Sequence, residues 1–438
     1  MDAEKSGSGR GLRSALAAAA NRIRGRVRQG TTLHSIASIA LGSGAGQAVA
    51  FLLAIPLARL YGPESFGLYA IFMVVVNSGT AIAGLRYELA IVLPKSDTWA
   101  HALYRLSVRS AAAVSATISL GFLVFYWVGG RDLYGGSLGL WLVGAGAAVF
   151  FTAGVTFVQY WMNREGDFRV LAKNRFAQAV LVPALQLIFA LIWPDLGGLA
   201  LGTVAGQAAA LALALFRAPS LRGAGVRPRI SAWEAAKRYK KMPLLNGPAT
   251  GLEIVRNSGI NAGIAARAVS GLGQYNMAWR LTHAPVVLIS GAVSQVFFRR
   301  MAKAPRGDMV RLLAAAVARM AAVAAAVCVP LYFLAPLLFP ALLGEQWREA
   351  GLMAQALIPW LAASAVASPV SMIFVAVQKQ QWFLAYSVFY TAAPLAYLAL
   401  TGATLVEVIA GLSWIMAGMS AVMLVLAFFV ARAYDRGR

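Results

Sequence analysis

The stretch that decides the fold is FGLYAIF at residues 66–72, because a related stretch, LGQYNMA, follows at residues 272–278. The glycine and the tyrosine match at one constant offset, as Gly67 and Tyr69 in the first copy and Gly273 and Tyr275 in the second. Each copy opens an apolar run, and the second copy comes six such runs after the first. The repeat therefore predicts a chain of two similar halves, each carrying the motif at the start of its second helix.

Composition places the chain in a membrane. Of its 438 residues 60% are hydrophobic and only 13% are charged, and the mean hydropathy is +0.68, far more apolar than a soluble domain. Cys328 is the only cysteine, so no intrachain disulfide or CxxC metal site is possible. Three scattered histidines are too few for a metal cage, and no cofactor is expected. The first apolar run, after His34, predicts a retained span rather than a cleaved signal.

A spanning helix needs about 20 apolar residues. Segments that meet this test start near residues 34, 66, 104, 137, 170, 196, 243, 274, 309, 351, 382 and 404. About twelve transmembrane helices are therefore expected. Because the repeat length is even, both halves have the same orientation. The predicted fold is an all-α integral membrane protein with two six-helix lobes, related by a pseudo-twofold along the membrane normal and enclosing a central cavity.

The basic residues predict the orientation. The net charge is +23, from 39 Lys and Arg against 16 Asp and Glu, and most of the bases fall in one set of alternating loops. The opposite loops hold only Arg59, Arg131, Arg267 and Arg348. Because cytoplasmic loops retain Lys and Arg, both termini are predicted to be cytoplasmic. This topology explains the excess positive charge without a nucleic-acid partner.

The expected division follows from these spans and loops. Its parts are a basic tail (1–33), a first lobe (34–217), a cytoplasmic linker (218–242), a second lobe (243–432) and a short tail (433–438). The tail contains RGLRSALAAAANRIRGRVRQG at residues 10–30. This stretch is either an amphipathic helix on the anionic inner leaflet or a disordered topology signal, and the sequence leaves both open.

Polar residues recur on one face of two predicted helices. With about 100° of rotation per residue, the seventh helix aligns Asn246, Thr250, Glu253, Asn257 and Asn261. The eighth aligns Asn276, Arg280, His283, Ser290 and Ser294. Arg256 lies three residues after Glu253, which predicts an intrahelical ion pair. Because charges in a span are costly, these stripes indicate a solvated cavity, with buried networks between helices as the alternative.

A third polar feature is GLRYELAIVLPK at residues 84–95. If the preceding helix continues through it, Arg86 and Glu88 lie about 200° apart and cannot share a face. Glu88 then shares a face with Asn77 and Thr80 and is predicted to line the cavity. Arg86 is predicted to point toward another helix or the inner headgroups, at the cytoplasmic mouth.

Three longer stretches carry a resemblance to a known family. They are GSGAGQAVAFLLAIPLARLYGPESFGLYAIFMVV (42–75), WMNREGDFRVLAKNR (161–175) and LGQYNMAWRLTHAPVVLISGAVSQVFFRRMA (272–302). Together with GLRYELAIVLPK, they resemble the Wzx-type polysaccharide flippases, including those for O-antigen. These belong to the multidrug/oligosaccharidyl-lipid/polysaccharide exporter superfamily.

The resemblance implies a function. Such proteins move undecaprenyl-diphosphate-linked oligosaccharides from the cytoplasmic to the periplasmic leaflet by alternating access, in O-antigen, capsule or exopolysaccharide biosynthesis. Arginine suits a diphosphate and asparagine suits sugar hydroxyls. A polysaccharide polymerase and a chain-length regulator are the expected protein partners. The candidate substrate-binding residues are Arg256, Arg280, Glu253, Asn257, Asn261, Asn246, Asn276, His283, Glu88 and Arg86.

Two other classes stay open at this point. An ion-coupled multidrug exporter of the same superfamily would use carboxylates, for which Glu253 and Glu88 are available, although the arginines would repel a cation. Glu253 could also carry a coupling proton, a role that Arg256 would oppose. A membrane-embedded polymerase or glycosyltransferase is less favoured, because the loops on the predicted periplasmic side are short. The sequence therefore favours a transporter without enzymatic activity.

Overall fold

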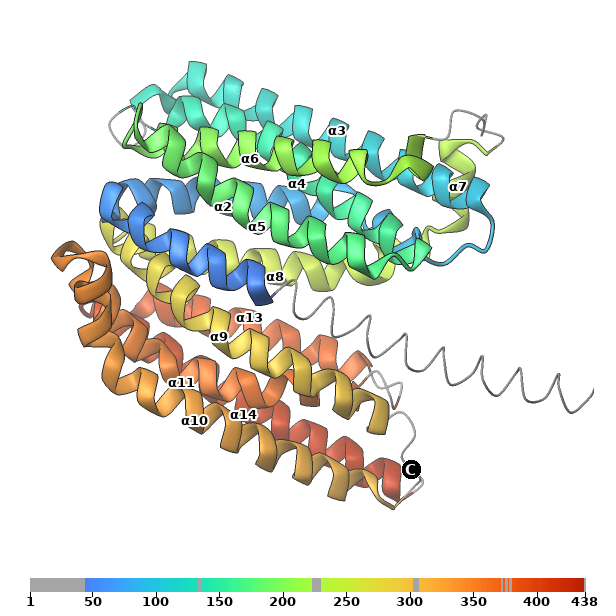
Figure 1. Ribbon diagram of the computed structural model, residues 1–438. Helices are drawn as coiled ribbons and strands as arrows, with labels where there is room; N and C mark the ends of the chain where they lie inside the picture. The colour runs from blue at the N-terminus through green and yellow to red at the C-terminus, as the bar shows by residue number, and fades with distance from the viewer. Residues whose placement is uncertain are drawn as a thin grey trace, which may run out of the picture.

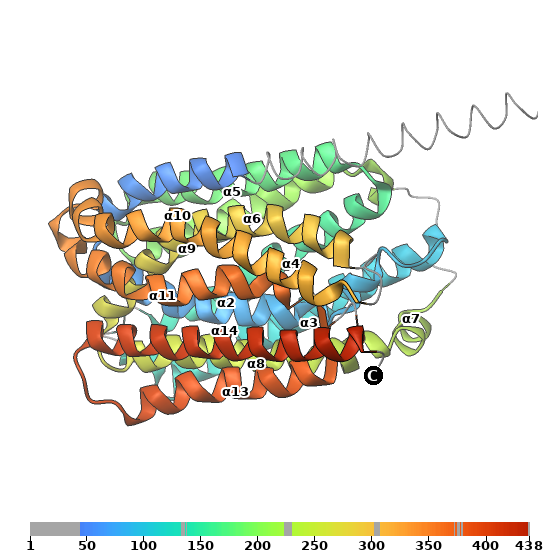
Figure 2. The ribbon, with the colours of Figure 1, turned by 90° about the horizontal axis from the view of Figure 1, so that it is seen from below.

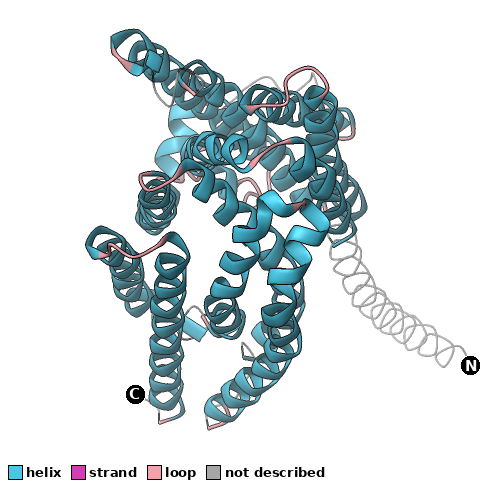
Figure 3. Ribbon diagram, turned by 90° about the vertical axis from the view of Figure 1, so that its left-hand side faces the viewer, coloured by secondary structure: helices cyan, strands magenta, loops and turns pink. Residues whose placement is uncertain are grey.

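The computed structural model describes residues 44–436, except 133–135, 137, 223–229, 302–306, 372, 375–376 and 378–379. The predicted basic tail and the first predicted helix start lie outside this range, as do the side chains of Ser290 and Ser294. All regular structure among the described residues is helical (Figure 3).

Two groups of long helices form the described chain. The first group is Gly44–Leu60, α2 (Pro63–Ala83), α3 (Asp97–Val128), α4 (Gly139–Glu165), α5 (Phe168–Ala190) and α6 (Leu196–Phe216). The second is α8 (Lys241–Ala265), α9 (Val269–Met301), α10 (Met309–Leu343), α11 (Arg348–Val370), α13 (Gln380–Leu400) and α14 (Leu405–Asp435). Short elements are η1 (Tyr87–Ala90), η2 (Gly130–Asp132), η3 (Pro219–Arg222), α7 (Ala232–Arg238) and η4 (Glu345–Trp347).

The two groups are two lobes that lie one above the other in Figure 1. Eight of the described helices are long and apolar enough to cross a membrane. The predicted fold, an all-α membrane protein of two six-helix lobes, is confirmed. Predicted and observed helix starts agree for α6 and α10 and differ most for α3, which begins at Asp97 rather than near residue 104. The chain is therefore a multi-pass membrane protein.

The helix α7 lies in the connection between the lobes, at the same end of the molecule as the C-terminus (Figure 2). Ser231 caps it, since its Oγ accepts from the Glu234 N–H at 3.1 Å while its own N–H donates to the Glu234 carboxylate at 2.9 Å. Ala235 is buried in an apolar cluster with Tyr87 of η1. The Tyr87 hydroxyl donates to the Ala236 carbonyl at 3.4 Å, so α7 and η1 are in contact.

At the opposite end, the two glycines of the repeat pack against each other's helix. A Cβ at Gly67 of α2 would overlap the carbonyl of Val269, the first residue of α9. Reciprocally, a Cβ at Gly273 of α9 would overlap the carbonyl of Pro63, the first residue of α2. The absence of both side chains lets the backbones of the two lobes touch. The two repeated glycines, Gly67 and Gly273, thus form a contact between the lobes.

Hydrogen bonds seal the same end. Gln346 Nε2 and Trp347 Nε1 both donate to the Ala58 carbonyl, at 3.0 and 2.7 Å. Arg59 Nε donates to the Leu342 carbonyl at 3.0 Å. The rings of Phe66 and Trp347 meet edge to face with centroids 5.4 Å apart. The lobes are therefore joined at the end remote from α7.

The glycine contact makes a stability prediction. Gly67→Ala and Gly273→Ala each place a methyl group against a backbone carbonyl that cannot rotate away, and such overpacking costs about 1–3 kcal/mol. We expect each variant to lower the thermal midpoint of the detergent-purified protein by several degrees. The matched control is Gly144→Ala in α4, where a Cβ meets no atom within 4 Å and where alanine favours the helix. Equal midpoints for Gly67→Ala and Gly144→Ala would contradict this account.

Candidate functional site

The segment after α2 departs from its predicted course. α2 ends at Ala83, and Leu85 and Arg86 have φ angles of 49° and 64°, in the left-handed region that non-glycine residues rarely adopt. The chain then forms the short helix η1. The prediction of one continuous helix through Glu88 is therefore wrong, and the angular separation derived from it does not apply. Arg86 Nη1 lies 3.9 Å from Glu88 Oε1, so the two residues form an ion pair.

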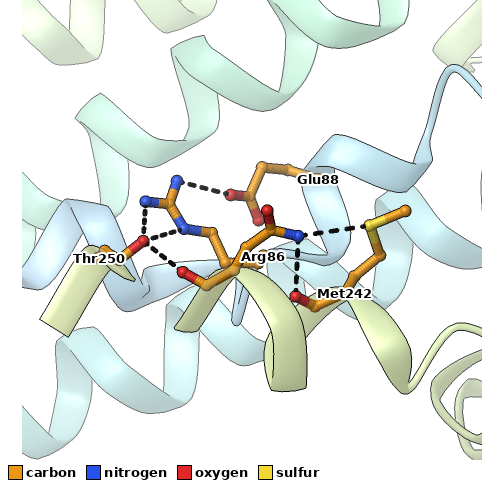
Figure 4. A network of polar contacts seen from close by, with 5 residues as sticks. Arg86, Glu88, Met242 and Thr250 are labelled. Atoms are coloured by element: carbon orange, nitrogen blue, oxygen red, sulfur yellow. Dashed lines mark hydrogen bonds and ion pairs between the residues drawn. The ribbon is translucent and has the colours of Figure 1, made fainter. Parts of the chain in front are cut away.

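The left-handed turn also sets where the two charged side chains lie. Arg86 reaches from the first lobe to α8 of the second, where its Nε and Nη2 both donate to Thr250 Oγ1, with Nε at 2.9 Å (Figure 4). Glu88 is only 6% exposed, and its carboxylate packs against Gly84, where a Cβ would overlap it. Arg86, predicted to point toward another helix, does so and also lines a hollow, whereas Glu88, predicted to line the cavity, does not line that hollow.

That hollow, which we call the serine-lined hollow, has a volume of about 470 Å³ and lies between Arg86 and the helices α8, α11, α13 and α14. Its polar lining comprises Arg86, Asn246, Thr250, Glu253, Arg256, Ser364, Ser368, Ser371, Ser387, Thr391 and Ser420, with Tyr386 and Tyr390. Two guanidinium groups face it against one carboxylate. The local charge therefore favours an anion.

Arg256 is held by contacts other than the predicted one. Its guanidinium carbon lies 4.7 Å from the centroid of the Tyr390 ring, and Nη2 donates to Asn257 Oδ1 at 3.3 Å. The ion pairs among the described residues do not include Glu253 with Arg256, so that prediction is wrong. Arg256 thus contacts Tyr390 of α13 across the hollow as well as the next residue of its own helix.

A second hollow, which we call the aromatic hollow, has a volume of about 590 Å³ and lies nearer the sealed end. The residues of α9 that line it are Asn276, Trp279, Arg280 and His283. The rings of Trp279 and His283 are stacked, with centroids 4.7 Å apart. From the first lobe it takes Gln47, Phe66, Tyr69, Met73, Val182 and Gln186. The sequence predicted one central cavity lined by both arginines, whereas among the described residues Arg256 and Arg280 line different hollows.

Amide side chains connect α8 to α9 between the hollows. Asn276 Nδ2 donates to Asn261 Oδ1 at 3.0 Å, and Asn261 Nδ2 donates to the Asn257 carbonyl at 2.7 Å. Neither Asn257 nor Asn261 lines either hollow. The predicted polar stripe on α8 therefore divides. Asn246, Thr250 and Glu253 face the serine-lined hollow. Asn261 makes the contact between helices that was the alternative interpretation, whereas Asn257 bonds within α8.

Several lining residues were absent from the sequence prediction. Ser364 and Ser368 of α11 and Ser371, which caps its C-terminus, are spaced four and three residues apart, the same pattern that identified the stripe on α8. Gln186 was not identifiable in this way. It stands alone on α5, and its role comes from bonds to Tyr69 and Thr203, both at 2.9 Å. No group of three or more His, Cys, Asp or Glu among the described residues could hold a metal ion.

Glu88, outside the spanning helices, gives a pH prediction. Burial raises the pKa of its carboxyl group, and the charge of Arg86 only partly opposes this. Because the folded-state pKa is above the unfolded one, the protonated form stabilises the fold, and that stability is lost as the pH rises through the raised pKa. We therefore expect Glu88→Gln to reduce the fall in thermal midpoint as the pH rises above 4.5, the ordinary pKa of this group. Exposed Glu345→Gln is the control, and parallel curves for both variants would contradict the prediction.

Comparisons with known proteins place this geometry in a family. Residues 56–351 match the family described as "Polysaccharide biosynthesis protein". A search of curated proteins found no matching sequence.

Solved structures share the fold. An inward-facing multidrug resistance MATE family transporter of the MOP superfamily is 17% identical with a TM-score of 0.62, covering 89% of this chain and 95% of that one. A MOP superfamily transporter from Pyrococcus furiosus is 15% identical, with a TM-score of 0.60 and coverages of 92% and 95%. The lipid II flippase MurJ, in an inward closed conformation, is 11% identical, with a TM-score of 0.67 and coverages of 90% and 87%. With the fold of the MOP superfamily and a family match over more than half its length, this chain belongs to the family of polysaccharide biosynthesis proteins.

Proposed function

We propose that this protein is a flippase for undecaprenyl-diphosphate-linked oligosaccharide, which it moves from the cytoplasmic to the periplasmic leaflet during the synthesis of a surface polysaccharide. The observation that carries the proposal is that Arg86 of the first lobe and Arg256 of the second line the same hollow. Membership of the polysaccharide biosynthesis family supports a glycan as cargo. The proposed role is transport, without catalysis or a cofactor.

The two arginines suit a diphosphate. A guanidinium group donates parallel hydrogen bonds to phosphate oxygens, and the bonds are strengthened by the charge. The serines and Asn246 around them offer the mixed donors and acceptors that sugar hydroxyls require. A prenyl tail needs no polar passage and can stay in the lipid. The serine-lined hollow is thus proposed to bind the diphosphate and the first sugars.

The aromatic hollow is proposed as a second binding site along the transport pathway. It contains the other buried cation of the predicted site, Arg280, together with Asn276 and His283. It lies nearer the sealed end, so a cargo that moves from Arg256 toward Arg280 approaches the side on which it must leave. Separation of the lobes at the Gly67 contact would open that side, while the Arg86 to Thr250 contact would hold the α7 side closed.

The orientation is part of the proposal. The bases of the sequence place the α7 end in the cytoplasm, because Lys237, Arg238, Lys240 and Lys241 gather there. The protein would then be a bacterial inner membrane protein with both termini in the cytoplasm. A polymerase and a chain-length regulator that act on the delivered glycan are the proposed partners.

The test uses variants of the two arginines. Arg86→Ala and Arg256→Ala should each reduce the flipping of a fluorescent lipid-linked oligosaccharide in proteoliposomes by about tenfold or more, since each removes charge-assisted bonds to phosphate. Arg256→Lys should recover only part, because lysine lacks the planar fork. The control is Arg348→Ala, whose exposed side chain pairs with Glu345 and lines neither hollow. Normal flipping by both alanine variants would overturn the site assignment.

Glu253 favours a second candidate function, the export of a cationic compound, because its carboxylate faces the serine-lined hollow. The two functions predict opposite results for one variant. Glu253→Gln should abolish export of a cation, whereas it should leave the flipping of an anionic lipid-linked glycan intact or faster. Drug sensitivity of a deletion strain with unchanged surface glycan would favour the exporter.

A further inference from the structure

A further hollow, of about 490 Å³, lies on the outer face of the first lobe between α5 and α6. Most of its lining is apolar and comes from both helices, including Phe176, Val180, Leu181 and Leu213. Two cations, Lys173 and Arg217, line it as well. They stand near the start of α5 and just after the end of α6, at the α7 end. The hollow is therefore an apolar trough with positive charge at one end.

Arg217, just after the end of α6, is held in position by the buried amide of Asn174. Arg217 Nη1 donates to Asn174 Oδ1 at 3.0 Å, and Asn174 is only 3% exposed. The Asn174 amide nitrogen in turn lies 3.0 Å from Met162 Sδ of α4. A buried polar side chain is costly unless it is hydrogen-bonded, and here its carbonyl oxygen faces the guanidinium at the rim of the trough. Lys173, by contrast, is exposed and can move toward a ligand.

This trough is separate from the proposed cargo path. Val182 and Gln186 of α5 line the aromatic hollow, whereas Val180 lines the trough. Residues 180 and 182 are about 200° apart on a helix. The two hollows therefore lie on opposite faces of α5, and a ligand in the trough contacts the surrounding bilayer rather than the space between the lobes.

We propose that this trough binds an anionic phospholipid, with its phosphate between Lys173 and Arg217 and an acyl chain along the apolar wall. The charge at the rim matches an anionic headgroup, and the apolar length matches a chain that runs along the helices. The basic loops place this rim at the cytoplasmic leaflet, whose anionic lipids attract basic residues. The inference concerns the lipid surroundings of the protein and does not depend on the proposed cargo.

The test measures stabilisation of the full-length protein by lipid. Phosphatidylglycerol added to the detergent-purified protein should raise the thermal midpoint in a saturable way, and phosphatidylcholine should not. Lys173→Gln with Arg217→Gln should weaken the apparent affinity for phosphatidylglycerol by about tenfold or more. The matched control is Lys240→Gln with Lys241→Gln, which removes two exposed charges at the same end of the molecule and should keep the wild-type affinity.

A single variant and a soluble headgroup test the site independently of the double variant. Because Lys173 is exposed, Lys173→Gln alone should fold normally and still lose several-fold in affinity, whether or not the double variant is stable. Glycerol phosphate, which has the headgroup without chains, should leave the midpoint unchanged. Equal affinities of the Lys173 variant and the control would overturn the site, and equal stabilisation by glycerol phosphate would overturn the lipid as its occupant.

Discussion

The structure depends on one close contact, in which the first turns of α2 and α9 meet without side chains between them. Gly67 lies against the Val269 carbonyl and Gly273 against the Pro63 carbonyl, so each lobe supplies the same element to the other. Lipid offers no hydrophobic drive for helices to associate, and small residues that allow backbone contact are one of the main remaining sources of affinity. The sealed end, and with it the position of both hollows, follows from this contact.

The other end of the interface is built differently. There the chain leaves α2, turns through two left-handed residues and places Arg86 across the interface on Thr250. A left-handed conformation at a non-glycine residue costs of order 1–3 kcal/mol and persists only where its surroundings fix it. The ion pair with Glu88 and the bonds to α8 supply such surroundings. One lobe contact is therefore made by backbone packing and the other by a polar side chain, which can be broken at a smaller cost.

The polar groups between the lobes serve two purposes. Some, such as Asn261 and Asn276, bond to each other and join α8 to α9. Others, such as Arg86 and Arg256, face open space beside serines. The bonded amides fix the inner surface of the second lobe. The arginines give the hollow beside it a net positive charge. A binding surface between moving lobes needs both, because the cargo groups must meet residues that keep their places.

The amino-acid sequence by itself determined the parts of this protein that depend on helical period, length and composition. It predicted the starts of the long helices from α2 onward to within seven residues, and the two similar lobes. It also identified the stripe on α8, since these features follow from local patterns that every spanning helix must satisfy. Only the tertiary structure decided which groups Arg86 and Glu88 contact, because a left-handed turn after Ala83 produces no periodic pattern in the sequence. It also decided that Arg256 stacks on Tyr390 and that Arg280 lies in another hollow. Those choices depend on side chains more than one hundred residues away in the chain, whose distance and direction are set by packing between helices rather than by any spacing along one of them.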